Sequence, residues 1–400
     1  MTPEVRDRIE QIRHGNVPDG YKKTRSGIVP TEWTDACLGD IYAERKEPGN
    51  ESLPLLMVSI HSGVSDGEVD EDDLPKKVKR IEDKSQYKRA AKGDLVFNMM
   101  RAWQGAIGTV RTEGMVSPAY IVAEPNNMVD PMFMDFYMKM NRMVHTIHRQ
   151  SYGVTDFRLR LYWDSFAPIQ CVLPSVGEQK KIAEILTAQD KVIELKEKRL
   201  AEKQRQKKYL MQQLLTGKKR LPGFDGKWNL KKISDISTYK ASSITANSLE
   251  TYSGDEIYPV YDANSIFRYV DFYESKEAYV SIVKDGAGAG RVALAAANSS
   301  VIGTMGYLYP TGQILVEYLY YFLASIDFSK YCNGSTIPHV YYKDYSLEKI
   351  LLPCIKEQEQ IVKVLAAADK EIDLLCQDIE QERQKKKALM QLLLTGIVRV

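Results

Sequence analysis

A basic run in the first quarter of the chain leads into a short stretch that is rich in base-reading side chains. The run KKVKRIEDKSQYKRAAK, residues 76–92, has eight Lys/Arg against two acids, and GDLVFNMMRAWQGAIG follows it with the pattern of two strands and a turn. Arginine and glutamine can form paired hydrogen bonds with the edges of guanine and adenine. A single charge run is usually a solvated loop, however, and Trp103 fits a core position equally well. The candidate contact residues here are Lys88, Arg89, Arg101, Trp103 and Gln104.

Two further arginines alternate with leucines later in the same part of the chain. Arg158 and Arg160 occur in FRLRL, and an extended segment with this alternation places both guanidinium groups on one face. Surface salt bridges are the alternative use of such a pair. We favour nucleic-acid contacts.

The second half of the chain carries a different set of polar side chains. VKDGAGAGRV, residues 283–292, lacks the GxGxxG spacing of a nucleotide-binding loop, so we expect a turn that brings Lys284 and Arg291 to phosphates. A polar and aromatic cluster follows at a position that matches Arg158 and Arg160. Tyrosine-rich surfaces also occur at protein interfaces, which leaves that alternative open. The cluster consists of Ser335, Thr336, His339, Tyr341, Tyr342 and Lys343.

Motifs for catalysis and cofactor binding are missing from the sequence. No Pro-Pro pair occurs, so the [N/D/S]PP[Y/F] motif of adenine-amino methyltransferases is absent, and there is no GxxxxGK[ST] loop for ATP. We therefore expect no catalytic residue and no cofactor in this chain.

Cysteine and histidine usage argues against disulfides and metal sites. The five cysteines are scattered without a CxxC pair, and the only close histidine pair, His145 and His148, has no other ligand type clustered beside it. No apolar run approaches the ~20 residues needed to cross a bilayer. We expect a cytoplasmic protein without a metal site. The net charge of +2 says little, because local basic patches can be masked in the total.

A long internal repeat provides the elements that must position these residues. KKYLMQQLLTG at 207–217 returns as KKALMQLLLTG at 386–396, with nine of eleven letters identical and an offset of 179 residues. The same offset places Glu178-Gln179 on Glu357-Gln358 and Leu173-Pro174 on Leu352-Pro353. The register holds across the whole segment, so a complete unit is duplicated.

Each copy of the repeat has the heptad pattern of one long helix. The first copy, from Gly177 to Leu215, would be roughly 58 Å long at ~1.5 Å per residue, and a single apolar stripe of this length needs a partner. We predict that the two copies pair as an antiparallel coiled coil; the alternative is that each packs only on its own domain. Polar gaps at Gln189, Lys196, Lys203 and Lys207 would fix the register. The predicted seam is Ile182, Leu186, Ile193, Leu200, Leu210 and Leu214 in the first copy, with Ile361, Leu365, Ile372, Leu375, Ile379, Leu389 and Leu393 in the second.

The stretches before the two helices share their ends but differ inside, which predicts an α+β fold with two mixed α/β domains and an internal pseudo-two-fold repeat. Residues 1–24 resemble the end of a repeat that begins at the C-terminus, so we expect the termini to lie close together. The expected division is 1–24, domain 25–172, helix 173–220, domain 221–351 and helix 352–400. Strands are expected at Leu53–Ile60, Asp94–Asn98, Tyr120–Ala123, Ala278–Val283, Val292–Ala297 and Tyr307–Tyr309, with short helices at Pro131–Met143 and Leu315–Ser325.

Two variable domains alternating with two heptad helices, each opening LPxxxEQxxI and closing LMQxLLTG, resemble the specificity subunit of type I restriction–modification systems. The resemblance covers essentially the full chain. It implies two target recognition domains that each read half of a split site in double-stranded DNA. It also implies a coiled coil that sets the spacer and docks two modification (methyltransferase) subunits, which two restriction subunits can join. S-adenosylmethionine, and ATP with Mg²⁺ for restriction, would bind to those partners. The competing hypothesis is a coiled-coil adaptor whose two globular domains bind proteins and not DNA.

Overall fold

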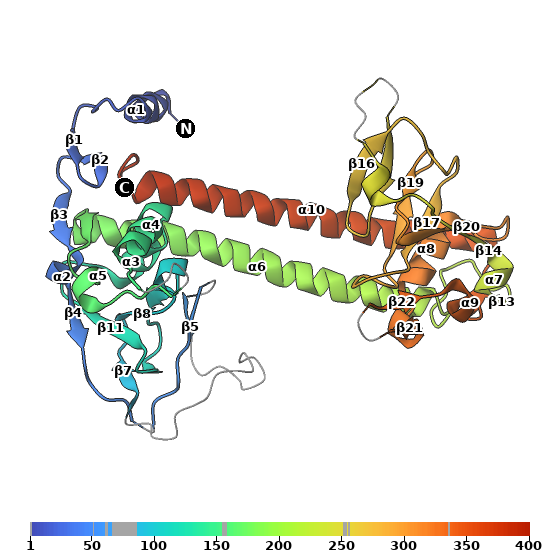
Figure 1. The fold of residues 1–400 in the computed structure, drawn as a ribbon, viewed down its shortest axis with the longest axis horizontal. Helices are drawn as coiled ribbons and strands as arrows, with labels where there is room; N and C mark the ends of the chain where they lie inside the picture. The colour runs from blue at the N-terminus through green and yellow to red at the C-terminus, as the bar shows by residue number, and fades with distance from the viewer. Residues whose placement is uncertain are drawn as a thin grey trace. The chain divides into compact units, whose positions relative to one another are not determined.

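The computed structural model describes residues 2–50, 52–60, 63–65, 86–153, 158–250, 254, 257–334 and 337–400. The chain forms two compact units (Figure 1). The first unit consists of Met1–Leu195 with Ile379–Val400, and the second consists of Lys196–Asp378. Each unit includes part of both repeated helices, which are α6 (Val176–Leu214) and α10 (Ile355–Leu393).

A four-stranded antiparallel sheet forms the centre of the first unit, in the order β4-β11-β8-β9. The strands are β4 (Tyr42–Arg45), β8 (Leu95–Asn98), β9 (Ile107–Thr109) and β11 (Tyr120–Pro125). β8 is apolar at successive positions because both of its faces are covered. Leu95 and Phe97 pack into the main core with helix α3 (Pro131–Met138), and Val96 faces a smaller apolar cluster on the other side.

The remaining elements of the first unit surround this sheet. Helix α3 begins where Asp130 accepts a hydrogen bond from the backbone N–H of Phe133, 2.9 Å away, with Pro131 in the first turn. The other elements are α1 (Pro3–Arg13), β1 (Tyr21–Thr24), β2 (Gly27–Pro30), β3 (Thr34–Cys37), α2 (Leu38–Ile41), β5 (Val58–Ser59), β6 (Gly63–Val64), β7 (Lys88–Ala90), the 3-10 turn η3 (Ala102–Gln104), β10 (Gly114–Val116), α4 (Asn141–Gln150), α5 (Trp163–Phe166) and β12 (Gln170–Leu173).

The second unit repeats this plan. Its central antiparallel sheet has the order β14-β20-β17-β18, with strands β14 (Ser237–Ala241), β17 (Tyr279–Val283), β18 (Val292–Ala295) and β20 (Met305–Pro310). Helix α8 (Val316–Ala324) occupies the place of α3. The other elements are β13 (Asn229–Lys232), α7 (Ile233–Ile236), η4 (Ala246–Ser248), β15 (Tyr258–Tyr261), β16 (Ile266–Val270), β19 (Ser300–Val301), η5 (Phe328–Tyr331), β21 (Cys332–Asn333), β22 (His339–Val340), α9 (Tyr342–Tyr345) and β23 (Lys349–Leu352).

The predicted α+β fold with an internal repeat is confirmed, since the two sheets have the same strand order and the same antiparallel pairing. Just before each long helix, β12 pairs with β3 in the first unit, and β23 pairs with β13 in the second. The exact division of the chain into five segments stays a prediction.

Two secondary-structure predictions are wrong in part. The expected helix Pro131–Met143 is two helices, because the backbone of Met140 is extended (φ −61°, ψ 138°) and α4 begins at the next residue. The expected strand Leu53–Ile60 is reduced to β5, which covers only Val58–Ser59. Pro54 has no N–H to offer a strand partner, and the adjoining Leu55 makes only an isolated bridge.

The two long helices lie antiparallel to each other, as predicted. In the first unit, Ile182 and Leu186 of α6 share a core with Leu389 and Leu393 of α10. In the second unit, the corresponding core joins Leu210 and Leu214 of α6 to Ile361 and Leu365 of α10. All thirteen predicted seam residues are buried or partly buried. Both cores also contain residues of the adjoining sheet, so each unit holds the helix pair through its own globular part.

Every predicted polar gap in α6 meets an acidic residue of α10. Gln189 Nε2 donates to a carboxylate oxygen of Glu382 at 2.7 Å, and Lys196 Nζ donates to Asp378 at 2.7 Å. Lys203 lies 2.8 Å from Glu371, and Lys207 is paired with Asp369. Such pairs inside an apolar seam favour one register of the two helices over its neighbours.

The Glu-Gln pair that opens each helix explains why that motif is duplicated. Gln179 is fully buried and donates to the carbonyl oxygens of Met128 and Pro174 at 3.0 Å, and it accepts from the N–H of Asp130 at 2.8 Å. Its twin Gln358 makes the same three kinds of bond, to the carbonyls of Gln313 and Pro353 and from the N–H of Leu315. Each glutamine therefore joins a helix start to the backbone of its domain.

The preceding glutamates bind arginines that are also 179 residues apart. Glu357 accepts two hydrogen bonds from Arg220, at 2.7 and 2.8 Å, and Glu178 accepts two from Arg399, at 2.5 and 3.0 Å. Because Arg399 is the penultimate residue, this contact holds the C-terminus in the first unit.

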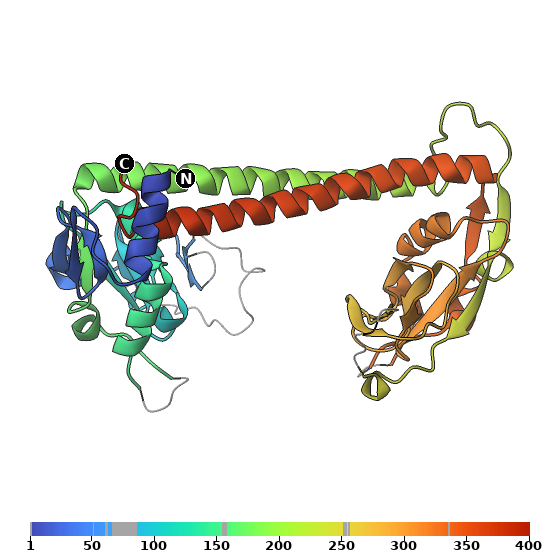
Figure 2. The same cartoon turned by 90° about the horizontal axis from the view of Figure 1, so that it is seen from above.

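Residues near the two ends of the chain contact each other within the first unit. Arg8 of α1 donates to the carbonyl oxygen of Ile397 at 2.6 Å, and the Tyr21 hydroxyl donates to that of Gly396 at 2.6 Å. Figure 2 shows α1 beside the C-terminal residues. The contacts agree with the expectation that the termini lie close together.

Candidate nucleic-acid interface

The turn between β8 and β9 presents the first group of candidate residues. Arg101 and Gln104 are exposed at the 3-10 turn η3, as the strand–turn–strand pattern predicted. Trp103 is half-buried, donates its indole N–H to the Met100 carbonyl oxygen at 2.9 Å, and packs against His148 with ring centres 5.5 Å apart. Trp103 therefore anchors the turn to α4 and keeps part of its ring accessible.

The arginine pair lies at the same end of this sheet. The backbone N–H of Leu161 donates to the Met99 carbonyl oxygen at 2.9 Å, which holds the segment 158–161 against the β8–β9 turn. Arg158 and Arg160 are exposed and Leu161 is buried, in agreement with the predicted alternation. Among the described residues neither guanidinium has a carboxylate partner. The structure thus brings Arg101, Arg158 and Arg160 together and leaves their charges available.

Lys88 and Arg89 on β7 are more constrained than the sequence suggested. Lys88 Nζ donates to the carbonyl oxygen of Tyr120 at 2.8 Å, and burial lowers the pKa of the ammonium group. Arg89 binds Glu47 at 2.6 Å and Glu113 at 2.7 Å, and these hydrogen bonds raise its pKa. Its charge is already balanced by two carboxylates. DNA contacts by Lys88 and Arg89 stay a prediction, and residues 76–85 of the same basic run lie outside the described residues.

In the second unit, the turn between β17 and β18 contains Lys284 and Arg291. This turn leads into strand β18, whereas a glycine-rich nucleotide-binding loop leads into a helix, so the turn is not such a loop. Gly290 is required here, because its φ is +87° and an added Cβ would lie 2.3 Å from the Cβ of Phe328. Lys284 is half-buried, with its Nζ 3.8 Å from Asp285.

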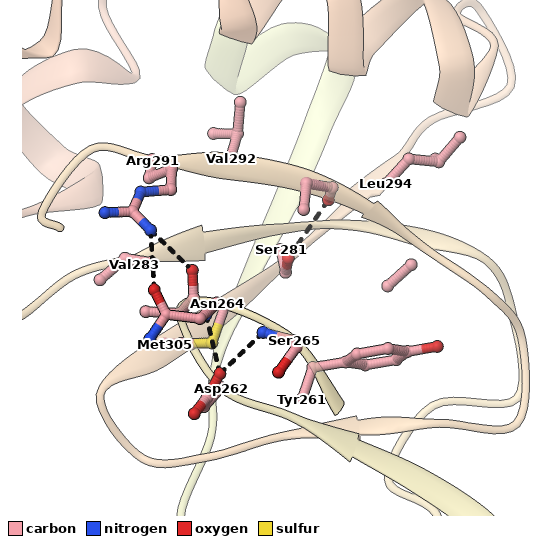
Figure 3. A pocket seen from close by; sticks show the side chains of 13 residues that line it. Tyr261, Asp262, Asn264, Ser265, Ser281, Val283, Arg291, Val292, Leu294 and Met305 are labelled. Atoms are coloured by element: carbon pink, nitrogen blue, oxygen red, sulfur yellow. Dashed lines mark hydrogen bonds between the residues drawn. The ribbon is translucent and has the colours of Figure 1, made fainter. Parts of the chain in front are cut away.

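Arg291 is anchored to a neighbouring turn that the sequence did not reveal. One of its terminal nitrogens donates to the Ala263 carbonyl oxygen at 3.0 Å and to the Asn264 side-chain oxygen at 3.1 Å (Figure 3). Asp262 holds that turn by accepting from the N–H groups of Asn264 and Ser265. Together they border a pocket of about 240 Å³. Because guanidinium has five donors, Arg291 retains others for a ligand.

The polar and aromatic cluster lies against the β17–β18 turn. The backbone N–H of Val340 donates to the Lys284 carbonyl oxygen at 2.8 Å, the counterpart of the Leu161–Met99 bond in the first unit. His339 Nδ1 lies 2.7 Å from an Asp285 carboxylate oxygen. The ring of Tyr341 is nearly parallel to that of His339, with ring centres 6.3 Å apart, and Lys343 Nζ lies 5.5 Å from the centre of the Tyr341 ring.

Tyr342 of the cluster does not join this surface in the same way. Tyr342 is half-buried, stacks on Tyr239 and donates to the Ser237 carbonyl oxygen, so it supports the fold. Ser335 and Thr336 lie outside the described residues. DNA contacts by Lys284, Arg291, His339, Tyr341 and Lys343 stay predictions.

Sequence reasoning missed two residues at these surfaces. Tyr152 is 57 % exposed and exchanges two backbone hydrogen bonds with Arg160, at 2.9 and 3.0 Å. Asp285 is the partner of His339. Asp285 has no local signal, since its partner is 54 residues away. The duplicated register around Arg160 and His339 was the one clue that pointed to both segments.

Metal binding and membrane insertion find no support in the described part of the chain. Its residues form no group of three or more histidine, cysteine, aspartate or glutamate side chains that could hold a metal ion. Each helix found there is too short or too polar to cross a lipid bilayer.

Comparisons with known proteins agree with the duplicated architecture. A family model described as the type I restriction modification DNA specificity domain matches residues 225–382. The type I restriction enzyme MjaVIII specificity subunit of Methanocaldococcus jannaschii is 22 % identical over 96 % of both chains. The putative type I restriction enzyme MjaX specificity subunit of the same organism is 23 % identical over 96 % of this chain and 97 % of its own.

Two solved structures share the fold. The S subunit of a type I restriction–modification system from M. genitalium has a TM-score of 0.58 at 13 % identity, covering 90 % of this chain and 96 % of its own. A chain from a structural study of type I R-M complex assembly also has a TM-score of 0.58, at 16 % identity, covering 92 % and 99 %. The comparisons give no support to the alternative of a protein adaptor. The resemblance found in the sequence is confirmed: the chain contains a match to the type I restriction modification DNA specificity domain and is similar along nearly its full length to specificity subunits of type I restriction–modification systems.

Proposed function

We propose that each unit of this chain reads one half of a split, asymmetric site in double-stranded DNA. The observation that carries the proposal is the matched position of two unlike surfaces. Arg158 and Arg160 in the first unit, and His339 and Tyr341 in the second, project from segments held to equivalent strand turns by equivalent backbone bonds. Equivalent frames with different exposed side chains are what two unlike half-sites require.

The proposal assigns no chemical step to this chain. Modification subunits would bind S-adenosylmethionine and transfer its methyl group to the N6 atom of adenine, after the base has been flipped out of the duplex. Restriction subunits, with ATP and Mg²⁺, would join the same assembly. The chain would supply recognition and the coiled coil that sets the spacer between half-sites. A cytoplasmic location follows from these partners and fits the free cysteines.

Sequencing of N6-methyladenine in cells that express this chain with its modification subunits tests the proposal. The expected result is one split recognition sequence that disappears when the chain is absent. Exchange of residues 25–172 for the corresponding domain of a relative should change one half-site and leave the other unchanged. A methylation pattern without a split sequence, or one that the exchange does not alter, would contradict the proposal.

The helices offer two equivalent sites for two identical partners. Leu195 of α6 is 54 % exposed, and Leu374 of α10, which is 179 residues further along the chain, is 56 % exposed. A single exposed leucine is common on protein surfaces, so the support for a docking site is the recurrence of the exposed leucine at equivalent positions of the two helices. A pseudo-two-fold repeat presents the same surface twice, so two copies of one partner can bind equivalently.

Leu195→Glu and Leu374→Glu should therefore each reduce the number of bound modification subunits from two to one, and the double variant should bind none. Native mass spectrometry of the purified complex measures this directly. Ala201→Glu is the matched control, because position 201 is exposed and its twin is already Glu380. Two bound subunits in both leucine variants would show that docking occurs elsewhere.

A further inference from the structure

The first unit contains a basic groove that lies apart from the predicted reading residues. It forms where the α3–α4 junction meets the last third of α10, and its volume is about 490 Å³. Its described lining includes no aspartate or glutamate. Five cationic residues border it: Lys139, Arg142, Arg383, Lys386 and Lys387.

Part of this positive charge is uncompensated. Lys139 is paired with Asp135 at 2.8 Å, and Lys386 is paired with Asp190 at 2.5 Å. Arg142 and Lys387 are exposed, and no carboxylate among the described residues binds either of them. Within the described part of the chain, the Arg142 guanidinium donates a hydrogen bond only to the neutral hydroxyl of Tyr137, at 3.3 Å. A groove of this kind attracts anions.

Helix α4 connects the groove to the reading surface of the first unit. Asn141, at its start, borders the groove and also borders a shallow pocket with Trp103 and His148. Arg149 is exposed in the last turn. The ten residues of α4 extend about 15 Å, the length of roughly four base pairs at 3.4 Å each. A single duplex could therefore contact both surfaces.

The described residues of the second unit lack the helix that forms one side of this groove. The second unit has η5 after α8 and no counterpart of α4 among its described residues. Lys387 has a twin in Lys208 of α6, which is also exposed and has no carboxylate partner in the described part of the chain. No helix equivalent to α4 faces Lys208. Lys208 therefore serves as a matched control for Lys387, because it has the same position in its helix but does not border the groove.

We propose that this groove binds the phosphate backbone of DNA next to the half-site read by the first unit. The inference rests on the proposed function and adds a contact that is independent of sequence. The two cations that no described carboxylate binds, Arg142 and Lys387, suit phosphate oxygens, and contacts with phosphates are independent of the base sequence. An acidic segment of a partner protein is the competing occupant, and continuity with the reading surface favours DNA.

Salt titration of the full chain, assembled with its modification subunits, tests the proposal. The Kd values for a duplex carrying the mapped site and for a scrambled duplex are measured across a series of salt concentrations. Each lost phosphate contact should make the dependence of log Kd on log salt shallower, reducing the magnitude of its slope by about 0.9. Lys387→Gln and Arg142→Gln should each reduce the slope by this amount on both duplexes. The double variant should reduce the slope by about 1.8. Lys208→Gln should leave the slope unchanged.

Different failures have different meanings. Unchanged slopes with intact specific binding would overturn the groove and leave the proposed function standing. A reduced slope on the mapped site but not on the scrambled duplex would indicate base contacts and would also overturn the groove proposal. Loss of modification-subunit binding with unchanged slopes would overturn it too, because the groove would then bind a protein. If the complex without substitutions does not bind the mapped site more tightly than the scrambled duplex, the proposed function itself is wrong. The variants are folded if their thermal unfolding midpoints equal the midpoint of the chain without substitutions.

Discussion

Replacement of Arg158 and Arg160 together by glutamine should weaken binding to the chain's own DNA site by about 100-fold. Each arginine contact with a base edge contributes about 1–3 kcal/mol, and 1.4 kcal/mol corresponds to a factor of ten. The two guanidinium groups are exposed, and no carboxylate among the described residues competes for them. Fluorescence anisotropy with duplexes mutated in either half-site measures the effect. The variant should stop discriminating one half-site and continue to discriminate the other.

Arg111→Gln is the matched control for this experiment. Arg111 is also exposed and lies in the same unit, but it follows the end of β9, at the opposite end of the sheet from the β8–β9 turn. Its replacement should change the affinity less than threefold. Equal losses in the control and the double variant would mean that Arg158 and Arg160 contribute only general charge, and the assignment of a reading surface to that end of the sheet would be wrong.

Gln358→Leu should produce the largest loss of stability, about 3 kcal/mol or more in the free energy of unfolding of the second unit. Leucine has a similar volume but leaves the N–H of Leu315 and the carbonyls of Gln313 and Pro353 without their partner. Each buried polar group that loses its hydrogen bond costs about 1–3 kcal/mol. Scanning calorimetry should show a lower transition temperature for that unit.

The duplicated residue makes the experiment internally controlled. Gln179→Leu should destabilise the first unit by a similar amount, because its three hydrogen bonds are of the same kind. Gln384→Leu, on an exposed face of α10, should change the unfolding free energy by less than about 0.5 kcal/mol. A large effect of Gln384→Leu, or none of Gln358→Leu, would contradict the structural role assigned to the buried glutamines.

The repeated helices could be predicted in detail because their information is local and is written twice. The heptad spacing identified the apolar stripe, and the polar gaps at Lys196 and Lys203 marked positions that do face the other helix. The offset of 179 residues also gave the correct register between Arg160 and His339. By contrast, the break at Met140 has no local mark such as proline or glycine, and the prediction of one helix there failed.

The candidate site was less predictable because its partners are distant in sequence. Arg89 looks like part of a basic run, yet its carboxylate partners are 42 and 24 residues away. Arg291 is held by a turn 27 residues before it. Composition and spacing can identify cationic side chains, but whether a charge remains available depends on these long-range contacts. The charges of Arg158 and Arg160 are not bound by a described carboxylate, whereas the charge of Arg89 is bound by two.

The buried glutamines have a consequence for how such chains diversify. Each holds its globular part through backbone carbonyl and N–H groups alone, which every amino acid except proline provides. An incoming domain from another gene needs only the right path of its main chain to be accepted at that junction. We therefore expect that exchange of a whole domain requires no compensating substitution at the glutamine, although the incoming core must still pack against the apolar residues of both helices.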